Sequence, residues 1–123
     1  MRTIPTRELG TGTDQPAQVR EWAQGLLTGL DPEDVADAVL VLDELVSNAV
    51  CHGASPVRVR LVRAAGHLRI EVTDASPSPA RPRPPDLDGG RGLMLVDACS
   101  LRWGQWRHGA GKTVWAELAV AVG

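Results

Sequence analysis

The strongest constraint on the fold of this chain comes from two neighbouring segments in which apolar and polar residues alternate. In "VRVRLV" (57–62) and "LRIEVTD" (68–74) the apolar residues recur at every second position, the pattern of strands with one buried face. The short segment "AAGH" (64–67) separates them, and this predicts an antiparallel hairpin. The apolar face of a sheet built on such a hairpin has to be covered by other elements.

Two segments before the hairpin can supply that cover. "DQPAQVREWAQGLLTGL" (14–30) carries apolar residues at helical spacing, which predicts a helix with one buried stripe. The stripe consists of Val19, Trp22, Ala23 and Leu26. Residues 1–12 are weakly patterned, and we expect them to form an edge strand.

The clearest element is "DPEDVADAVLVLDELVSNAVCHG" (31–53), a long predicted helix. Asp31 is a good N-cap, Pro32 suits the first helical position, and Gly53 is a natural terminator. The apolar side of its helical wheel is expected to face the core and consists of Val39, Leu42, Val46, Ala49 and Val50.

The opposite side of the same helix carries an unusual pair. Glu44 and Asn48 lie only about 40° apart on the wheel, and apolar side chains flank them. These neighbours are Leu40, Val41 and Cys51. A face exposed to solvent rarely carries so much apolar bulk, so this side is expected to line a site.

The remainder of the chain divides into a loop, a helix and two strands. "ASPSPARPRPPDLDGG" (75–90) contains five prolines, and we predict a lid or binding loop there rather than a linker between domains. "RGLMLVDACS" (91–100) predicts a helix, and residues 101–120 predict two strands joined by a glycine-containing turn. The predicted fold class is therefore α+β: a two-layer α/β sandwich with a mostly antiparallel sheet and helices on one face.

Composition restricts the class of function. The chain of 123 residues predicts a single domain, and a net charge of −2 gives no reason to expect binding to nucleic acid. No apolar run is long enough to span a membrane, and the first residues lack a secretory signal. Cys51 and Cys99 do not form a disulfide framework in a chain of this size, and we expect a cytoplasmic protein.

Three sites are candidates for ligand binding. Glycines in "GGRGL" (89–93) precede a predicted helix, where free N–H groups favour an anion, although a flexible hinge is the alternative. Asp74 at a strand end could accept a hydrogen bond from an amine or could simply be solvated. The amide of Asn48 suits Mg²⁺, and Glu44 could deprotonate a hydroxyl, or both could be ordinary surface residues.

Two further features have simpler interpretations. His52 lies at the C-terminal end of a predicted helix, where a positively charged side chain interacts favourably with the helix dipole. "GAGKT" (109–113) lacks the first glycine of a Walker motif, since position 106 is Trp, and a strand follows it instead of a helix. We therefore predict no Walker-type site.

The order of these motifs resembles the GHKL ATPase family, and within it the small anti-sigma-factor serine kinases of bacteria. "ELVSNAVCHG" is similar to their N box, "EVTDASP" and "GGRGLMLV" to their two glycine boxes, and "GKTVWAEL" to their last motif. The resemblance spans roughly residues 14 to 120. It implies a Bergerat-type ATP site beneath a lid, ATP and Mg²⁺ as ligands, and a fold that agrees with the one predicted above.

The resemblance also implies roles for individual residues. Asn48 would hold Mg²⁺, Asp74 would recognise the adenine amino group, Thr113 would lie near the adenine, and Glu44 would act as the catalytic base. The remaining residues expected to bind ATP are His52, Gly89, Gly90, Arg91, Gly92 and Leu93.

The family function that the resemblance implies is transfer of the ATP γ-phosphate to a serine of an anti-anti-sigma (STAS-like) protein, together with sequestration of a sigma factor. The kinases it resembles often form homodimers. A non-catalytic ATP-binding regulator is the alternative, and it is favoured by Ser76 and Ser78, which replace two glycines of the first glycine box.

Overall fold

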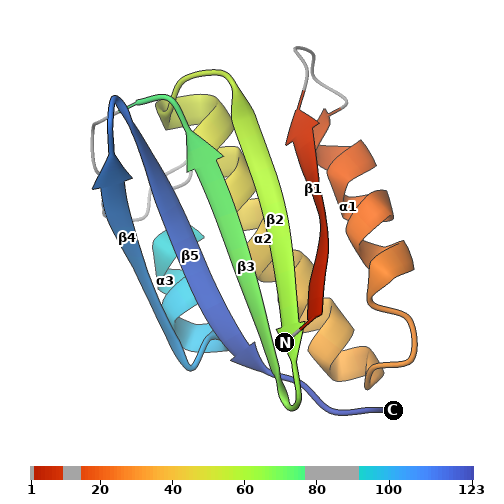
Figure 1. The fold of residues 1–123 in the computed structure, drawn as a ribbon. Helices are drawn as coiled ribbons and strands as arrows, with labels where there is room; N and C mark the ends of the chain where they lie inside the picture. Colours follow the sequence, from red (N-terminus) through yellow and green to blue (C-terminus); the bar gives the residue numbers. More distant parts are fainter. Residues whose placement is uncertain (1, 10–14, 77–91) are drawn as a thin grey trace.

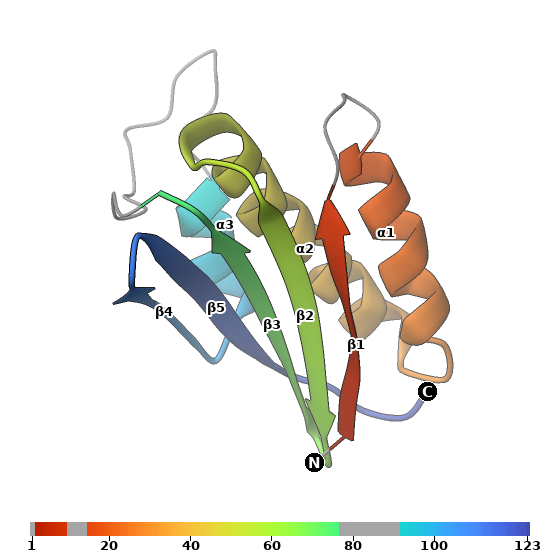
Figure 2. The same cartoon turned by 45° about the horizontal axis from the view of Figure 1, so that its top comes forward.

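The computed structural model describes residues 2–9, 15–76 and 92–123, which form a five-stranded sheet with three helices on one face (Figures 1 and 2). The strand order is β1-β2-β3-β5-β4, and every neighbouring pair is antiparallel. The elements are β1 (Arg2–Leu9), α1 (Gln15–Leu26), α2 (Pro32–His52), β2 (Val57–Ala64), β3 (His67–Asp74), α3 (Gly92–Cys99), β4 (Arg102–His108) and β5 (Gly111–Ala119). The predicted α+β sandwich is confirmed. Apart from Ala75 and Ser76, the predicted lid (75–90) lies outside the described residues.

The predicted hairpin is present as β2 and β3. Ala65 and Gly66 form its turn, where Gly66 adopts a φ of 77° that suits glycine. The chain then passes through α3 and β4 before β5 inserts between β3 and β4. The end of β3 is therefore flanked by the start of β5.

Helix α2 begins and ends where the capping residues predict. Asp31 accepts a hydrogen bond from the backbone N–H of Glu33 at 3.0 Å, and Gly53 donates its N–H to the carbonyl of Ala49 at 2.9 Å. The predicted buried face was partly wrong, because Val50 is 49% exposed whereas Val41 is fully buried. Helix α2 packs against α1 and α3 as well as the sheet, so its buried face is wider than one stripe and is rotated from the predicted one.

The core lies between the helices and the inner face of the sheet. Val19 and Ala23 of the predicted α1 stripe are buried, and Trp22 and Leu26 pack against the core. Every second residue of the central strands points into this layer, namely Val57, Val59, Leu61, Leu68, Ile70, Val72, Val114, Ala116 and Leu118. Within residues 2–9, 15–76 and 92–123, no helix has both the length and the apolarity that crossing a membrane requires.

Candidate functional site

The C-terminal ends of α2 and β3 lie at the same edge of the molecule (Figure 1). Backbone hydrogen bonding joins them, because Ala75 donates its N–H to the carbonyl of Ala54 at 2.8 Å. Ala54 in turn donates its N–H to Oδ1 of Asp74 at 3.4 Å. The carboxylate that ends β3 therefore lies against the residues that follow α2.

Two glycines make room for this carboxylate and its backbone. A Cβ at Gly53 would lie 2.5 Å from Cγ of Asp74 and 2.6 Å from the carbonyl oxygen of Ala49. A Cβ at Gly111, the first residue of β5, would lie 2.5 Å from the carbonyl oxygen of Asp74. Side chains at either position would collide with groups that cannot easily shift.

Asp74 is almost completely buried and is bonded on several sides. Besides Ala54, the N–H of Ser76 donates to Oδ1 at 2.7 Å. The ammonium of Lys112 lies 3.1 Å from Oδ1 and 2.9 Å from Oδ2, and the exposed fractions of the two side chains are 4% for Lys112 and 1% for Asp74. This is a buried ion pair between residues that face each other across β3 and β5.

The sequence analysis missed Lys112, although the sequence contains a signal for it. Lys112 is in phase with Val114, Ala116 and Leu118, the residues of β5 that point into the core. A lysine at a core-facing strand position needs a partner, because charged side chains are rarely buried alone. The last residue of the paired strand, Asp74, supplies it.

Glu44 and Asn48 lie one turn apart on α2, and both are half-buried. Partial burial raises the pKa of the Glu44 carboxyl, with a further contribution from the negative charge of Asp43. The turn that follows Asn48 contains Ala49, whose carbonyl accepts the N–H of Gly53 at 2.9 Å. A Cβ at Gly53 would lie 2.6 Å from this carbonyl oxygen and 2.6 Å from Oδ2 of Asp74. The structure thus brings Asn48 and Asp74 to one end of the α2–β3 pair.

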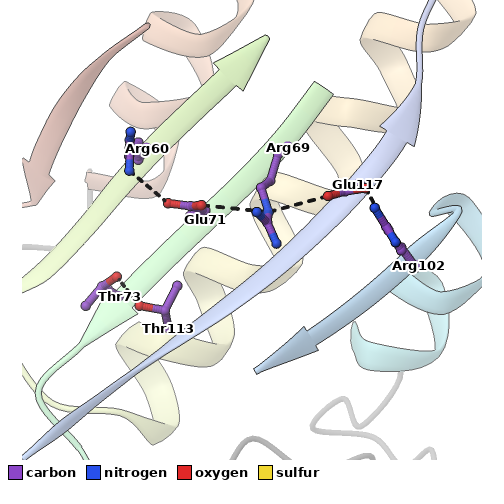
Figure 3. Close-up of polar contacts among 7 residues, drawn as sticks. All are labelled: Arg60, Arg69, Glu71, Thr73, Arg102, Thr113 and Glu117. Atoms are coloured by element: carbon purple, nitrogen blue, oxygen red, sulfur yellow. Dashed lines mark hydrogen bonds and ion pairs between the residues drawn. The ribbon is translucent and has the colours of Figure 1, made fainter. Parts of the chain in front are cut away.

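Thr113 points to the other face of the sheet. Its hydroxyl contacts the hydroxyl of Thr73 (Figure 3). The two oxygens lie 2.7 Å apart, and the Thr113 oxygen lies 2.9 Å from Nε2 of His108. Strand alternation places Thr113 opposite Thr73 and its neighbour Lys112 opposite Asp74. The structure therefore does not bring Thr113 together with Asp74; Lys112 takes that position.

The remaining predicted site residues are placed only in part. Gly92 begins α3, Leu93 is buried in the core, and His52 is the exposed last residue of α2. Gly89, Gly90 and Arg91 lie outside the described residues. In the part of the chain that the structure describes, no three His, Cys, Asp or Glu side chains gather as metal ligands would.

The outer face of the sheet, which none of the three described helices covers, carries a row of alternating charges (Figure 3). Arg60, Glu71, Arg69, Glu117 and Arg102 follow one another across the strands, with N–O distances of 3.6, 3.7, 3.7 and 2.7 Å. The hydrogen bond from Arg102 lowers the pKa of Glu117, and the charges of Arg102 and Arg69 add to this. The row lies on the opposite side of the sheet from Asp74.

Comparisons with known proteins agree on the type of domain. The sequence profile of the histidine kinase-like ATPase domain matches residues 12–118. The uncharacterized protein SCO4941 of Streptomyces coelicolor is 36% identical over an alignment of 85 residues, and the match covers 63% of this chain and 81% of that protein.

Two solved structures have a similar fold. The structure of the RsbU and RsbW domains of Rv1364c from Mycobacterium tuberculosis superposes with a TM-score of 0.73 at 22% identity, covering 98% of this chain and 34% of that one. The histidine kinase domain of the blue-light activated histidine kinase from Erythrobacter litoralis EL346 gives 0.59 at 18% identity, covering 90% and 66%. The chain thus spans about a third of the first structure and just under two thirds of the second.

Proposed function

Because this chain belongs to the histidine kinase-like ATPase domain family, we propose that it binds ATP where α2 and β3 end, and that it acts as an ATP-dependent regulator of partner proteins. The observation that carries this proposal is the buried Asp74 carboxylate held against the end of α2, the helix that also bears Glu44 and Asn48. We take residues 1–123 to work as one domain in this function.

In this proposal Asp74 accepts a hydrogen bond from the amino group of adenine. Its Oδ1 is held by the backbone N–H groups of Ser76 and Ala54, so the carboxylate has one fixed orientation. A hydrogen bond to an ionised and buried carboxylate is stronger than one between neutral groups. Because the carboxylate only accepts hydrogen bonds, it favours a base that carries a donor, such as an amino group, at this position. Thr113 has no part in this contact, since its hydroxyl lies on the other face of the sheet.

The triphosphate would extend from Asp74 toward Asn48 and the N-terminus of α3. The amide oxygen of Asn48 on α2 is proposed to hold Mg²⁺, because a neutral amide oxygen suits this hard cation, which shares such sites with phosphate oxygens and water. Bound Mg²⁺ neutralises phosphate charge. Gly92 and the preceding residues Gly89, Gly90 and Arg91 are proposed to hold the phosphates.

Glu44 is proposed as the base for transfer to a serine. The serine oxygen forms a bond to the γ-phosphorus, its proton passes to the Glu44 carboxylate, and the bond to ADP breaks so that ADP leaves. A raised pKa suits this role, because a carboxylate that binds a proton more tightly is a better base near neutral pH. The acceptor is proposed to be a serine of an anti-anti-sigma (STAS-like) protein, and the kinase is also proposed to sequester a sigma factor.

A titration of thermal stability with ATP and ADP, with and without Mg²⁺, tests the nucleotide site. We expect ATP to raise the melting temperature of the wild type, with Asn48→Ala losing the effect of Mg²⁺ and Asp74→Ala losing most of the effect of nucleotide. No shift in the wild type at millimolar ATP would contradict the proposal.

Incubation with γ-labelled ATP and a STAS-like protein separates the two candidate functions. Label on a serine of that protein, absent with Glu44→Ala, supports the kinase. Nucleotide binding that changes partner affinity without any transfer supports the non-catalytic regulator. Ser76 favours this second candidate, because it stands beside Asp74 where the family pattern has a glycine.

A further inference from the structure

Lys112 is the only lysine of the chain, and it is buried in the proposed nucleotide site. Its ammonium spans both oxygens of Asp74, at 3.1 and 2.9 Å. The family resemblance assigned no role to this residue. A lysine side chain has a long flexible stem, so its ammonium can leave a partner without movement of the backbone.

The donors around Asp74 differ in how freely they can move. Ser76 and Ala54 reach Oδ1 through backbone N–H groups, which are fixed by the fold. Lys112 instead reaches Asp74 through a side chain, and its ammonium is a donor to Oδ2 as well as to Oδ1. With the carboxylate 1% exposed, a ligand amine reaches Oδ2 only where the ammonium withdraws.

We propose that Lys112 is a base-specificity residue whose ammonium occupies, on Asp74, the position that the 6-amino group of adenine needs. This inference rests on the proposed function. The ammonium forms a charge-assisted hydrogen bond, whereas the adenine amine is a neutral donor and the weaker of the two. Binding of ATP therefore has to overcome the Lys112–Asp74 contact, which lowers the affinity for ATP.

The same geometry treats a 6-oxopurine differently. Inosine triphosphate has a carbonyl oxygen where ATP has the amine, and an ammonium with three N–H donors can bond that oxygen while remaining on Asp74. Lys112 therefore reduces the ratio of the affinity for ATP to the affinity for ITP. If Lys112 only held Asp74 in place, its removal would weaken ATP binding, which is the opposite sign.

Equilibrium binding of ATP and ITP with Mg²⁺ to the wild type, Lys112→Met and Lys112→Arg tests the inference. We expect the wild type to bind ATP and ITP within about tenfold of each other. Lys112→Met, similar in length but uncharged, should bind ATP about tenfold more tightly and ITP more weakly. Lys112→Arg keeps the cation and should resemble the wild type.

Folding of each variant is checked by circular dichroism, because loss of one partner of a buried ion pair destabilises a protein. A folded Lys112→Met that binds ATP no more tightly than the wild type overturns the inference. If that variant does not fold, the affinities of the wild type for ATP and ITP test the inference. A preference of the wild type for ATP of more than about tenfold overturns the inference, and a smaller preference supports it.

The outcomes also separate this inference from the proposed function. ATP binding by the wild type, with no gain in Lys112→Met, removes the role of Lys112 and leaves the nucleotide site standing. If neither the wild type nor the variant binds ATP or ITP, both the inference and the proposed function are overturned. Measurable ATP binding by the wild type that becomes tighter in Lys112→Met supports both the inference and the proposed function.

Discussion

Gly53 and Asp74 approach each other so closely that a Cβ on Gly53 would lie 2.5 Å from Cγ of the aspartate. The backbone at Gly53 has a φ of −98°, which other residues also adopt, so the glycine is needed for space and not for conformation. The missing side chain is what allows the carboxylate to lie against the end of α2.

Gly53→Ala should therefore displace the Asp74 carboxylate. The new methyl group would also collide with the backbone carbonyl of Ala49, 2.6 Å away, which cannot shift without distorting α2. We expect a loss of about 1–3 kcal/mol in the free energy of unfolding and weaker ATP binding.

The matched control for Gly53→Ala is Gly25→Ala in α1, where an added Cβ meets no atom within 4 Å. Alanine favours a helix over glycine, so this variant should be no less stable than the wild type. Chemical denaturation measures both. Equal stability and equal ATP affinity in Gly53→Ala and the wild type would contradict the close contact.

The Lys112–Asp74 ion pair predicts a thermodynamic cycle. Asp74→Asn leaves a buried ammonium without its counter-charge and should cost roughly 3–5 kcal/mol of unfolding free energy. The double variant Asp74→Asn, Lys112→Met removes both charges and should lose less than Asp74→Asn alone. Additive losses, measured by urea denaturation, would show that the two side chains do not interact.

An exposed pair provides the comparison for that cycle. Arg20 and Asp43 join α1 to α2 at 3.0 Å, with 45% and 28% of their side chains exposed. Because solvent screens such a pair, Asp43→Asn should cost less than about 1 kcal/mol. The difference between the two aspartates follows from burial, not from distance.

Most of the fold could be predicted from the sequence because its elements carry strong periodic patterns. The β2–β3 hairpin follows from alternation, and the start of α2 follows from Asp31 and Pro32. The buried face of α2 was predicted less well, because the packing of α3 against α2 depends on tertiary structure that a helical wheel does not contain.

The candidate site was predictable only where the local sequence pattern determines which face of the sheet a side chain points to. Asp74 was found as the carboxylate at a strand end, but its bond to Lys112 depends on the register between β3 and β5. A shift of one residue along a strand reverses the face of every side chain. The resemblance implied only that Thr113 lies near the adenine, and the register is what places Lys112, its neighbour in the motif "GKT", opposite Asp74.

Glu44→Gln should stop phosphate transfer while ATP binding persists, because glutamine has a similar shape but cannot take up the serine proton. A label-transfer assay and a binding assay measure the two effects separately. Transfer at the wild-type rate would remove Glu44 from the role of base.

The same variant has a defined effect on the pH dependence of stability. The pKa of Glu44 is raised in the folded protein, so the native state holds this proton more tightly than the unfolded chain does. The resulting stabilisation is fully present below about pH 4.3, the ordinary value for glutamate, and is lost as the pH rises through the folded pKa. Glu44→Gln should thus be more stable than the wild type at pH 7, with the difference shrinking in acid. Melting curves from pH 3.5 to 7.5 would contradict this if the gap widened in acid.

Thr113→Val tests which face of β5 belongs to the site. Valine keeps the shape of threonine but removes the hydroxyl that bonds Thr73 and His108, and this should cost about 1 kcal/mol of unfolding free energy. ATP affinity should be unchanged, because Asp74 and Lys112 lie on the opposite face. Thr28→Val, at an exposed position after α1, is the control and should change stability by less than about 0.5 kcal/mol. A fall in ATP affinity in Thr113→Val, measured by calorimetry with no matching loss in Thr28→Val, would place the outer hydroxyl within reach of the nucleotide and contradict the placement of the site on the helix side of the sheet.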